Sequence, residues 1–171
     1  MGLTFEEIYR ENFRYIYNMV YMRVLHRETA EDITSQVFLN ALAAFDRFDQ
    51  ENGLASPKTW LATIARNAII DHARLASVRH EQATEELPEV PVFDEQDGTQ
   101  MVLMQEVQRI MSQLNDKERE ILTLRDLMEL SYREIAEIIG VSEAAATERH
   151  RRTIAKCRKL EEGKMLSDFV S

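Results

Sequence analysis

A run of basic side chains lies near the C-terminus of the chain, with no acidic residue inside it. Its members are Arg149, Arg151, Arg152, Lys156, Arg158 and Lys159. Arginine can pair bidentately with guanine in the DNA major groove, and both arginine and lysine bind phosphates. Such a run can also be the solvated face of an ordinary helix, so its meaning depends on the element that carries it.

The residues before this run have the pattern of a helix-turn-helix. Ser131–Glu134 reads as a capping box that opens a short helix, Gly140 can end that helix in a left-handed conformation, and Ser142 can cap a longer helix. Ala136 is small at a position where the two helices must cross closely. Because an α-helix fits the major groove, the pattern predicts a DNA-binding helix that runs toward residue 160. The alternative is a plain helical hairpin within a bundle.

Apolar residues at three- and four-residue steps predict three helices in the first part of the chain. The first stripe begins at Phe5, and Thr29 has the features of the N-cap of a second helix. Turn-forming residues predict a loop over 49–57, and a third helix is expected to start near Lys58.

Between these regions the helical pattern stops, over residues 77–99. The wider segment 76–113 carries two basic and eight acidic side chains, a net charge of −6. Too little apolar surface is present there to offset the entropy of ordering the chain. The sequence therefore predicts an all-α protein made of two small helical domains, 1–76 and 100–171, joined by a flexible acidic linker.

The overall composition excludes several classes of protein. The 171 residues carry a net charge of −9, which argues against binding nucleic acid by bulk attraction alone. No apolar stretch approaches the ~18 residues of a membrane-spanning helix, and the N-terminus lacks the features of a secretory signal. A lone cysteine, Cys157, leaves no disulfide and no cysteine-based zinc site. We expect a cytoplasmic protein with no cofactor, no membrane insertion and no enzymatic activity.

Together the two halves resemble a bacterial RNA polymerase sigma factor of the sigma-70 family, of the short extracytoplasmic-function type. Three motifs in order carry this resemblance. Residues 30–38 (AEDITSQVF) are similar to region 2.2, residues 60–74 (WLATIARNAIIDHAR) to regions 2.3–2.4, and residues 132–143 (YREIAEIIGVSE) to region 4.2. The resemblance covers nearly all of residues 5–160.

The resemblance implies that the first domain docks on core RNA polymerase and opens the promoter −10 element. Polymerase contacts are expected at Asp32, Ser35, Gln36 and Leu39. Contacts to the −10 element are expected at Asn52, Lys58, Arg66, Asn67 and Arg74. The asparagines could read base edges and the cations could hold phosphates of the separated strand. Ordinary structural roles remain open, with Asp32 as a helix cap and Arg66 as an ion-pair partner, and a core role for Trp60 is favoured over base stacking.

The second domain is expected to read the −35 element as duplex DNA. The expected contacts are Thr147, Arg149, Arg151, Arg152 and Lys156. The resemblance further implies that the linker lies near the polymerase active site and that a dedicated anti-sigma factor inhibits the protein.

The sequence departs from the family pattern at both interfaces. Ser35 and Gln36 stand where a glutamine followed by an acid is common, and Thr147, Glu148 and His150 replace a lysine, a small polar residue and an apolar residue. These changes predict either an unusual −35 sequence or a weaker DNA contact. Two rival functions stay open, a helix-turn-helix regulator that binds DNA without polymerase and a helical protein-binding adaptor.

Overall fold

The computed structural model describes residues 2–51, 56–79 and 98–170, and within them all regular structure is helical. The chain divides into two compact units, Met1–Glu89 and Val90–Ser171. This agrees with the expected all-α class. The predicted linker, 77–99, falls largely outside the described residues; α3 (Pro57–Arg79) continues past the expected boundary at 76, and α4 (Gly98–Ser112) begins at residue 98.

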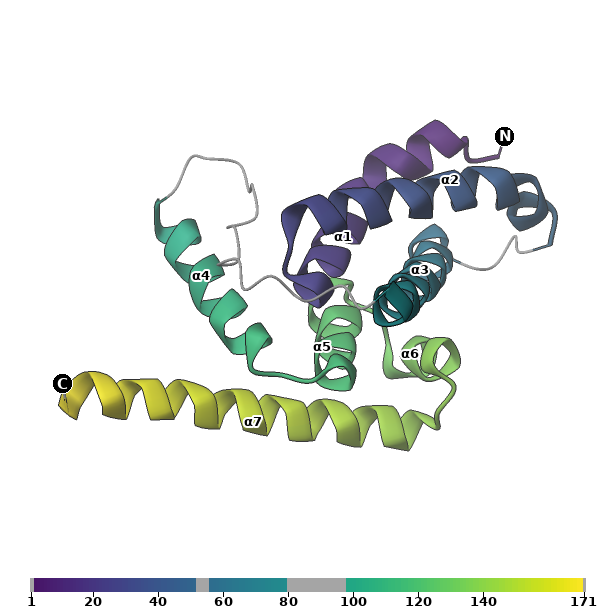
Figure 1. The fold of residues 1–171 in the computed structure, drawn as a ribbon. Helices are drawn as coiled ribbons and strands as arrows, with labels where there is room; N and C mark the ends of the chain where they lie inside the picture. The colour runs from purple at the N-terminus through teal and green to yellow at the C-terminus, as the bar shows by residue number, and fades with distance from the viewer. Residues whose placement is uncertain (1, 52–55, 80–97, 171) are drawn as a thin grey trace. The chain divides into compact units, whose positions relative to one another are not determined.

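The first unit is a bundle of α1 (Phe5–Val24), α2 (Arg27–Glu51) and α3, in which each helix contacts the other two (Figure 1). The apolar stripes of the three helices face one another, as their spacing predicts. Fully buried members of the stripes include Ile16, Val20, Val37, Ala41, Leu61 and Ala65. The polar side chains on the opposite faces are thereby left at the surface.

The start and the end of α2 differ from the prediction. The helix begins at Arg27, two residues before Thr29, and the backbone N–H of Thr29 donates to Nδ1 of His26 at 3.2 Å. His26 therefore supplies the capping acceptor that was wrongly assigned to Thr29. At its other end α2 continues to Glu51, so the prediction of a loop from residue 49 was wrong over three residues. Residues 52–55, the middle of that predicted loop, lie outside the described residues.

The second unit contains α4, α5 (Asp116–Leu122), a short π-helix η1 (Thr123–Leu127), α6 (Tyr132–Ile139) and α7 (Glu143–Val170). Helix α7 contacts α4, α5 and α6, and forms the long rod at the bottom of Figure 1. Fully buried apolar side chains of this unit are Ile121, Leu124, Met128, Ile135 and Ala146. The core therefore holds the first turns of α7 against the shorter helices.

The predicted turn between α6 and α7 is confirmed. The Ser131 hydroxyl accepts from the N–H of Glu134 at 3.1 Å, and the Glu134 carboxylate accepts from the N–H of Ser131 at 2.8 Å. Gly140 ends α6 with φ +72°, a left-handed conformation that would be strained for any residue with a side chain. The strain would lie in the backbone itself, because no atom lies within 4 Å of the point where a Cβ atom would be added. Ser142 Oγ then accepts from the N–H of Ala145 at 3.0 Å. Local capping thus fixes where α7 begins.

Glu129 has a left-handed backbone between η1 and α6, with φ +57° and an exposed side chain. This conformation costs a non-glycine residue about 1 kcal/mol or more. We expect Glu129→Gly to raise the free energy of unfolding by about 0.5–1 kcal/mol, measured by urea denaturation. Glu137→Gly is the matched control, because it removes the same exposed side chain from within α6 and is expected to lower stability by about 0.5–1 kcal/mol. A destabilised Glu129→Gly variant would contradict the prediction.

Candidate binding interfaces

The four expected polymerase contacts lie on one exposed face of α2. Asp32, Ser35, Gln36 and Leu39 are all exposed, and Leu39 is 60% accessible. An accessible leucine among polar side chains suits a protein–protein contact, where apolar anchors carry much of the affinity. Since α2 begins at Arg27, Asp32 lies beyond the first turn and does not cap the helix. The capping interpretation of Asp32 is therefore excluded.

The expected −10 contacts that lie on α3 differ in how exposed they are. Asn67 and Arg74 are exposed, and their separation of seven residues places them on the same side of the helix. Arg66 is half-buried and makes a contact within the structure. Asn52 lies outside the described residues. The helix therefore presents an amide and a guanidinium together, with Arg66 beside them.

Aromatic rings organise the start of α3. The Lys58 ammonium lies 4.6 Å from the centroid of the Tyr15 ring, a cation–π contact that holds this cation against α1. Trp60 stacks on Phe48 of α2 with 4.3 Å between ring centroids and 15° between ring planes. Because Phe48 is buried, this stack supports the favoured core role of Trp60.

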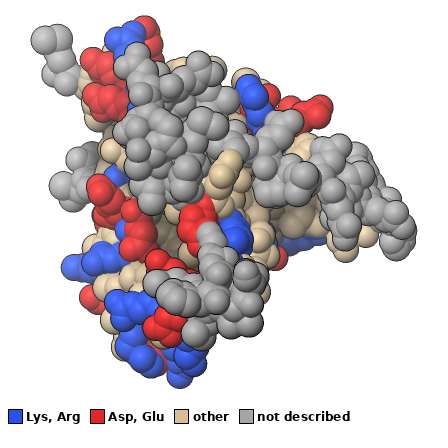
Figure 2. All heavy atoms as spheres, turned by 90° about the vertical axis from the view of Figure 1, so that its left-hand side faces the viewer, with Lys and Arg blue, Asp and Glu red and all other residues tan. Residues whose placement is uncertain are grey.

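The expected −35 contacts lie along α7, but several already have partners. Arg151 and Arg152 are 67% and 75% exposed, whereas Arg149, expected to project outward, is half-buried. Thr147 is exposed and donates its hydroxyl to the Glu143 carbonyl at 2.9 Å. Lys156 pairs with Glu118 of α5 at 2.8 Å. Figure 2 shows Lys and Arg side chains gathered at its lower edge, over α7, with acidic side chains among them.

Glu148 pairs with two exposed arginines of α7, Arg151 and Arg152. Its Oε1 lies 2.6 Å from Nη2 of Arg151 and 3.0 Å from Nε of Arg152. The two hydrogen bonds from Arg151, and then the one from Arg152, lower the pKa of Glu148 to about 2. Because this pKa lies below that of the unfolded chain, the stabilisation is complete above about pH 4.5 and is lost as the pH falls toward 2.

A second polar network holds α7 against the preceding elements. The Tyr132 hydroxyl lies 2.9 Å from Nδ1 of His150, and Nε2 of His150 lies 2.8 Å from the Asp126 carboxylate. The Arg125 guanidinium lies over the Tyr132 ring, 4.2 Å from its centroid. His150 thus joins α7 to η1 and α6 through hydrogen bonds.

Sequence reasoning missed several of these partners. The spacing of Glu148 to Arg151 and Arg152, three and four residues along a helix, is a signal that could have predicted their pairing. No local signal links Glu118 to Lys156, which is 38 residues further along the chain. Glu118 and Lys156 are brought together only by the packing of α5 against α7.

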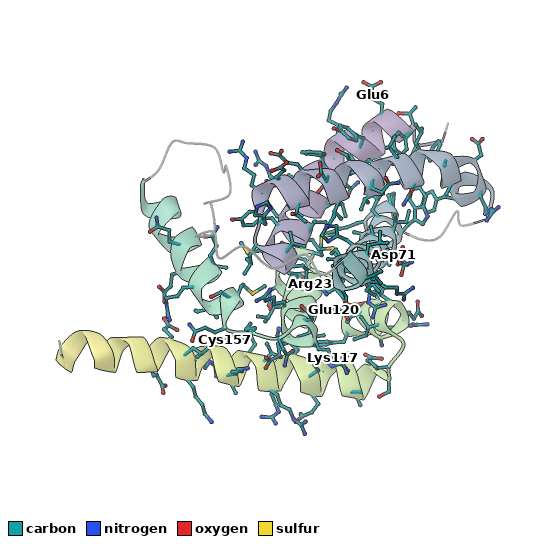
Figure 3. All side chains as sticks on the ribbon, viewed as in Figure 1. Glu6, Arg23, Asp71, Lys117, Glu120 and Cys157 are labelled. Atoms are coloured by element: carbon teal, nitrogen blue, oxygen red, sulfur yellow. The ribbon has the colours of Figure 1, made fainter. Side chains whose placement is uncertain are left out.

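The described residues carry no cluster of His, Cys, Asp and Glu that could hold a metal ion. Cys157 lies on α7 (Figure 3), where burial and then the Glu118 carboxylate raise the pKa of its thiol. No helix in the described part of the chain is long and apolar enough to span a bilayer.

Comparison with known proteins identifies both units. Sigma-70 region 2 matches residues 8–78, and Sigma-70, region 4 matches residues 104–157. The chain is 32% identical over 146 residues to the RNA polymerase sigma factor YlaC of Bacillus subtilis (strain 168), covering 81% of each protein. It is 33% identical over 151 residues to the ECF RNA polymerase sigma factor BldN of Streptomyces coelicolor, covering 83% of this chain and 54% of BldN.

The fold is also similar to that of a solved sigma factor. RpoE of Bartonella quintana, crystallised with the anti-sigma factor NepR, superposes with a TM-score of 0.76 at 21% identity, over 92% of this chain and 96% of RpoE. The matched regions decide against a regulator that acts without polymerase and against a helical adaptor. The chain therefore belongs to the sigma-70 family of RNA polymerase sigma factors, as an extracytoplasmic-function member: a non-enzymatic protein that binds core RNA polymerase and promoter DNA and directs transcription initiation.

Proposed function

We propose that this sigma factor divides its work between its two units, with residues 1–76 binding polymerase and opening the −10 element and residues 100–171 reading the −35 element. Residues 77–99 connect the two in this scheme and run near the polymerase active site. The observation that carries the proposal is the match of the two units to different sigma regions, each with an exposed helix face of suitable chemistry.

In the first unit the polymerase contact is assigned to Asp32, Ser35, Gln36 and Leu39. Their exposure on α2, opposite the buried Ile33 and Val37, supports this assignment. The exposed leucine supplies apolar area, while the polar neighbours supply hydrogen bonds to the partner.

The −10 contact is assigned to Asn52, Lys58, Arg66, Asn67 and Arg74. Exposed Asn67 and Arg74 on one side of α3 support it most directly, because an amide can read a base edge and a guanidinium can hold the phosphate beside it. Lys58 would keep its place over Tyr15 and act on phosphate from there.

The −35 contact is assigned to Thr147, Arg149, Arg151, Arg152 and Lys156 of α7. This helix follows the confirmed turn at Gly140, and a helix in that position of a helix-turn-helix enters the major groove. The pairs with Glu148 and Glu118 offset part of the positive charge, so we expect weak binding to DNA unless polymerase tethers both units near the promoter.

We also propose that the protein acts in the cytoplasm, where its polymerase is, and that an anti-sigma factor controls it. The second point is supported by the similar fold of RpoE, whose structure includes NepR. An inhibitor of this kind would cover the exposed faces of α2 and α7.

The division of labour is tested by replacing Asn67 and Arg74 together with alanine. In transcription assays with core polymerase and promoter fragments, we expect the double variant to lose most of the permanganate-reactive thymines that mark the opened −10 region. Its affinity for polymerase should stay unchanged, because α2 is not altered.

Arg10→Ala is the matched control, since Arg10 is an exposed arginine of the same unit that pairs with Glu6, which is labelled on α1 in Figure 3. This variant should open the promoter normally. If the Asn67 and Arg74 variant opened the promoter normally, this face of α3 would not be the site that separates the strands.

A further inference from the structure

Glu148 lies in the second turn of α7, and its side chain is 42% exposed. Arg151 and Arg152 lie three and four residues further along and flank it on either side, while Ala144 and Ala145 lie one turn before it. These alanines are exposed and small, so the carboxylate stands clear of bulky neighbours at the N-terminal end of the helix. In a helix-turn-helix this is the end that faces base edges.

The hydrogen bonds of Glu148 leave one acceptor site of its carboxylate unused. Oε1 accepts from Nη2 of Arg151 at 2.6 Å and from Nε of Arg152 at 3.0 Å, whereas Oε2 accepts only from Nε of Arg151 at 2.9 Å. A carboxylate offers about four lone-pair sites. Among the described residues no further donor reaches Oε2, so this oxygen keeps one acceptor site while the two guanidinium groups fix its orientation.

The ion pairs also allow a carboxylate to enter a negatively charged groove. Two arginines offset its charge, so the repulsion from DNA phosphates is reduced. With a pKa of about 2, Glu148 is ionised at neutral pH and is therefore an acceptor only. A side chain of this kind selects a base that presents a donor and penalises one that presents an acceptor.

We propose that Glu148 is a specificity-determining residue that reads a cytosine in the −35 element, by accepting a hydrogen bond from the cytosine N4 amino group at Oε2. In the major groove cytosine itself presents only this donor, whereas adenine carries the N7 acceptor beside its amino group, and guanine and thymine present acceptor oxygens. The inference rests on the proposed placement of α7 in the −35 groove.

The test uses the full chain with core polymerase and a promoter library randomised across the −35 region. Initiation is measured by sequencing the transcripts, and the wild type is compared with Glu148→Gln. The wild type is expected to prefer cytosine at one position by about five- to tenfold. Glutamine has almost the same shape but pairs bidentately with adenine, so the variant is expected to change that preference to adenine while the other positions stay the same.

Glu161→Gln is the matched control, because it removes the same charge from an exposed position further along α7 and is expected to keep the wild-type preferences. Identical base preferences in Glu148→Gln and the wild type would overturn the inference. This holds also if the variant is more active on every sequence, because Glu148 would then be only a counterion of the arginines. A changed position at which the wild type prefers a base other than cytosine would also overturn it. If the wild type selects no −35 sequence at all, the proposed function of α7 fails instead.

Discussion

Replacing Leu39 with glutamate is expected to lower the affinity for core RNA polymerase by about 30-fold or more, the effect of losing a central apolar anchor of an interface. Leu39 is 60% exposed at the C-terminal end of the α2 face, so the change buries a new charge only when polymerase is bound. The stability of the free protein should not change. Competition binding against a labelled sigma factor measures the affinity, and thermal unfolding checks the fold.

Leu75→Glu provides the matched control, because Leu75 is 56% exposed on α3 and lies outside the α2 face. It should bind polymerase nearly as well as the wild type. Replacing Asp32 and Gln36 with alanine should give a smaller loss than Leu39→Glu, since these residues would form the polar rim. Equal losses of polymerase affinity in Leu39→Glu and Leu75→Glu would show that the interface does not lie on the α2 face.

Replacing Arg149 and Arg152 together with alanine is expected to abolish initiation that depends on the −35 element and to leave polymerase binding intact. Each arginine that pairs bidentately with guanine contributes roughly 1–3 kcal/mol, so the loss of two corresponds to about 30-fold or more. Arg152 is 75% exposed and its only described partner is Glu148, so its removal should not disturb the fold. Run-off transcription on promoters with and without the −35 element measures the effect.

Replacing Arg158 and Lys159 with alanine removes the same charge from exposed positions two turns further along α7. This control should lower initiation only modestly and equally on all sequences, as the loss of phosphate contacts does. Loss of polymerase affinity in the Arg149 and Arg152 variant would contradict the division between the two units.

Features that depend on residues three or four positions apart were predictable from the amino-acid sequence alone. The buried stripes, the capping box at Ser131 and the left-handed Gly140 all follow from such local spacing, because a helix places these residues within contact of one another. The motif resemblance was of the same kind, since each motif lies within one helix or one turn. The family and the two-unit, all-helical fold therefore follow from local sequence patterns.

The availability of the functional side chains, in contrast, depends on tertiary packing. The pairing of Lys156 with Glu118, the cation–π contact of Lys58 with Tyr15 and the bond of His150 to Asp126 join residues that are distant in sequence. The start of α2 was missed for a different, local reason: its capping acceptor is the ring of His26, three residues before Thr29, and residue preferences do not favour histidine as a cap. Helical periodicity predicts which side of a helix faces inward. Which charges and rings come to lie beside that helix depends on how distant helices pack. This packing therefore sets the exposure and the electrostatic surroundings of each candidate contact.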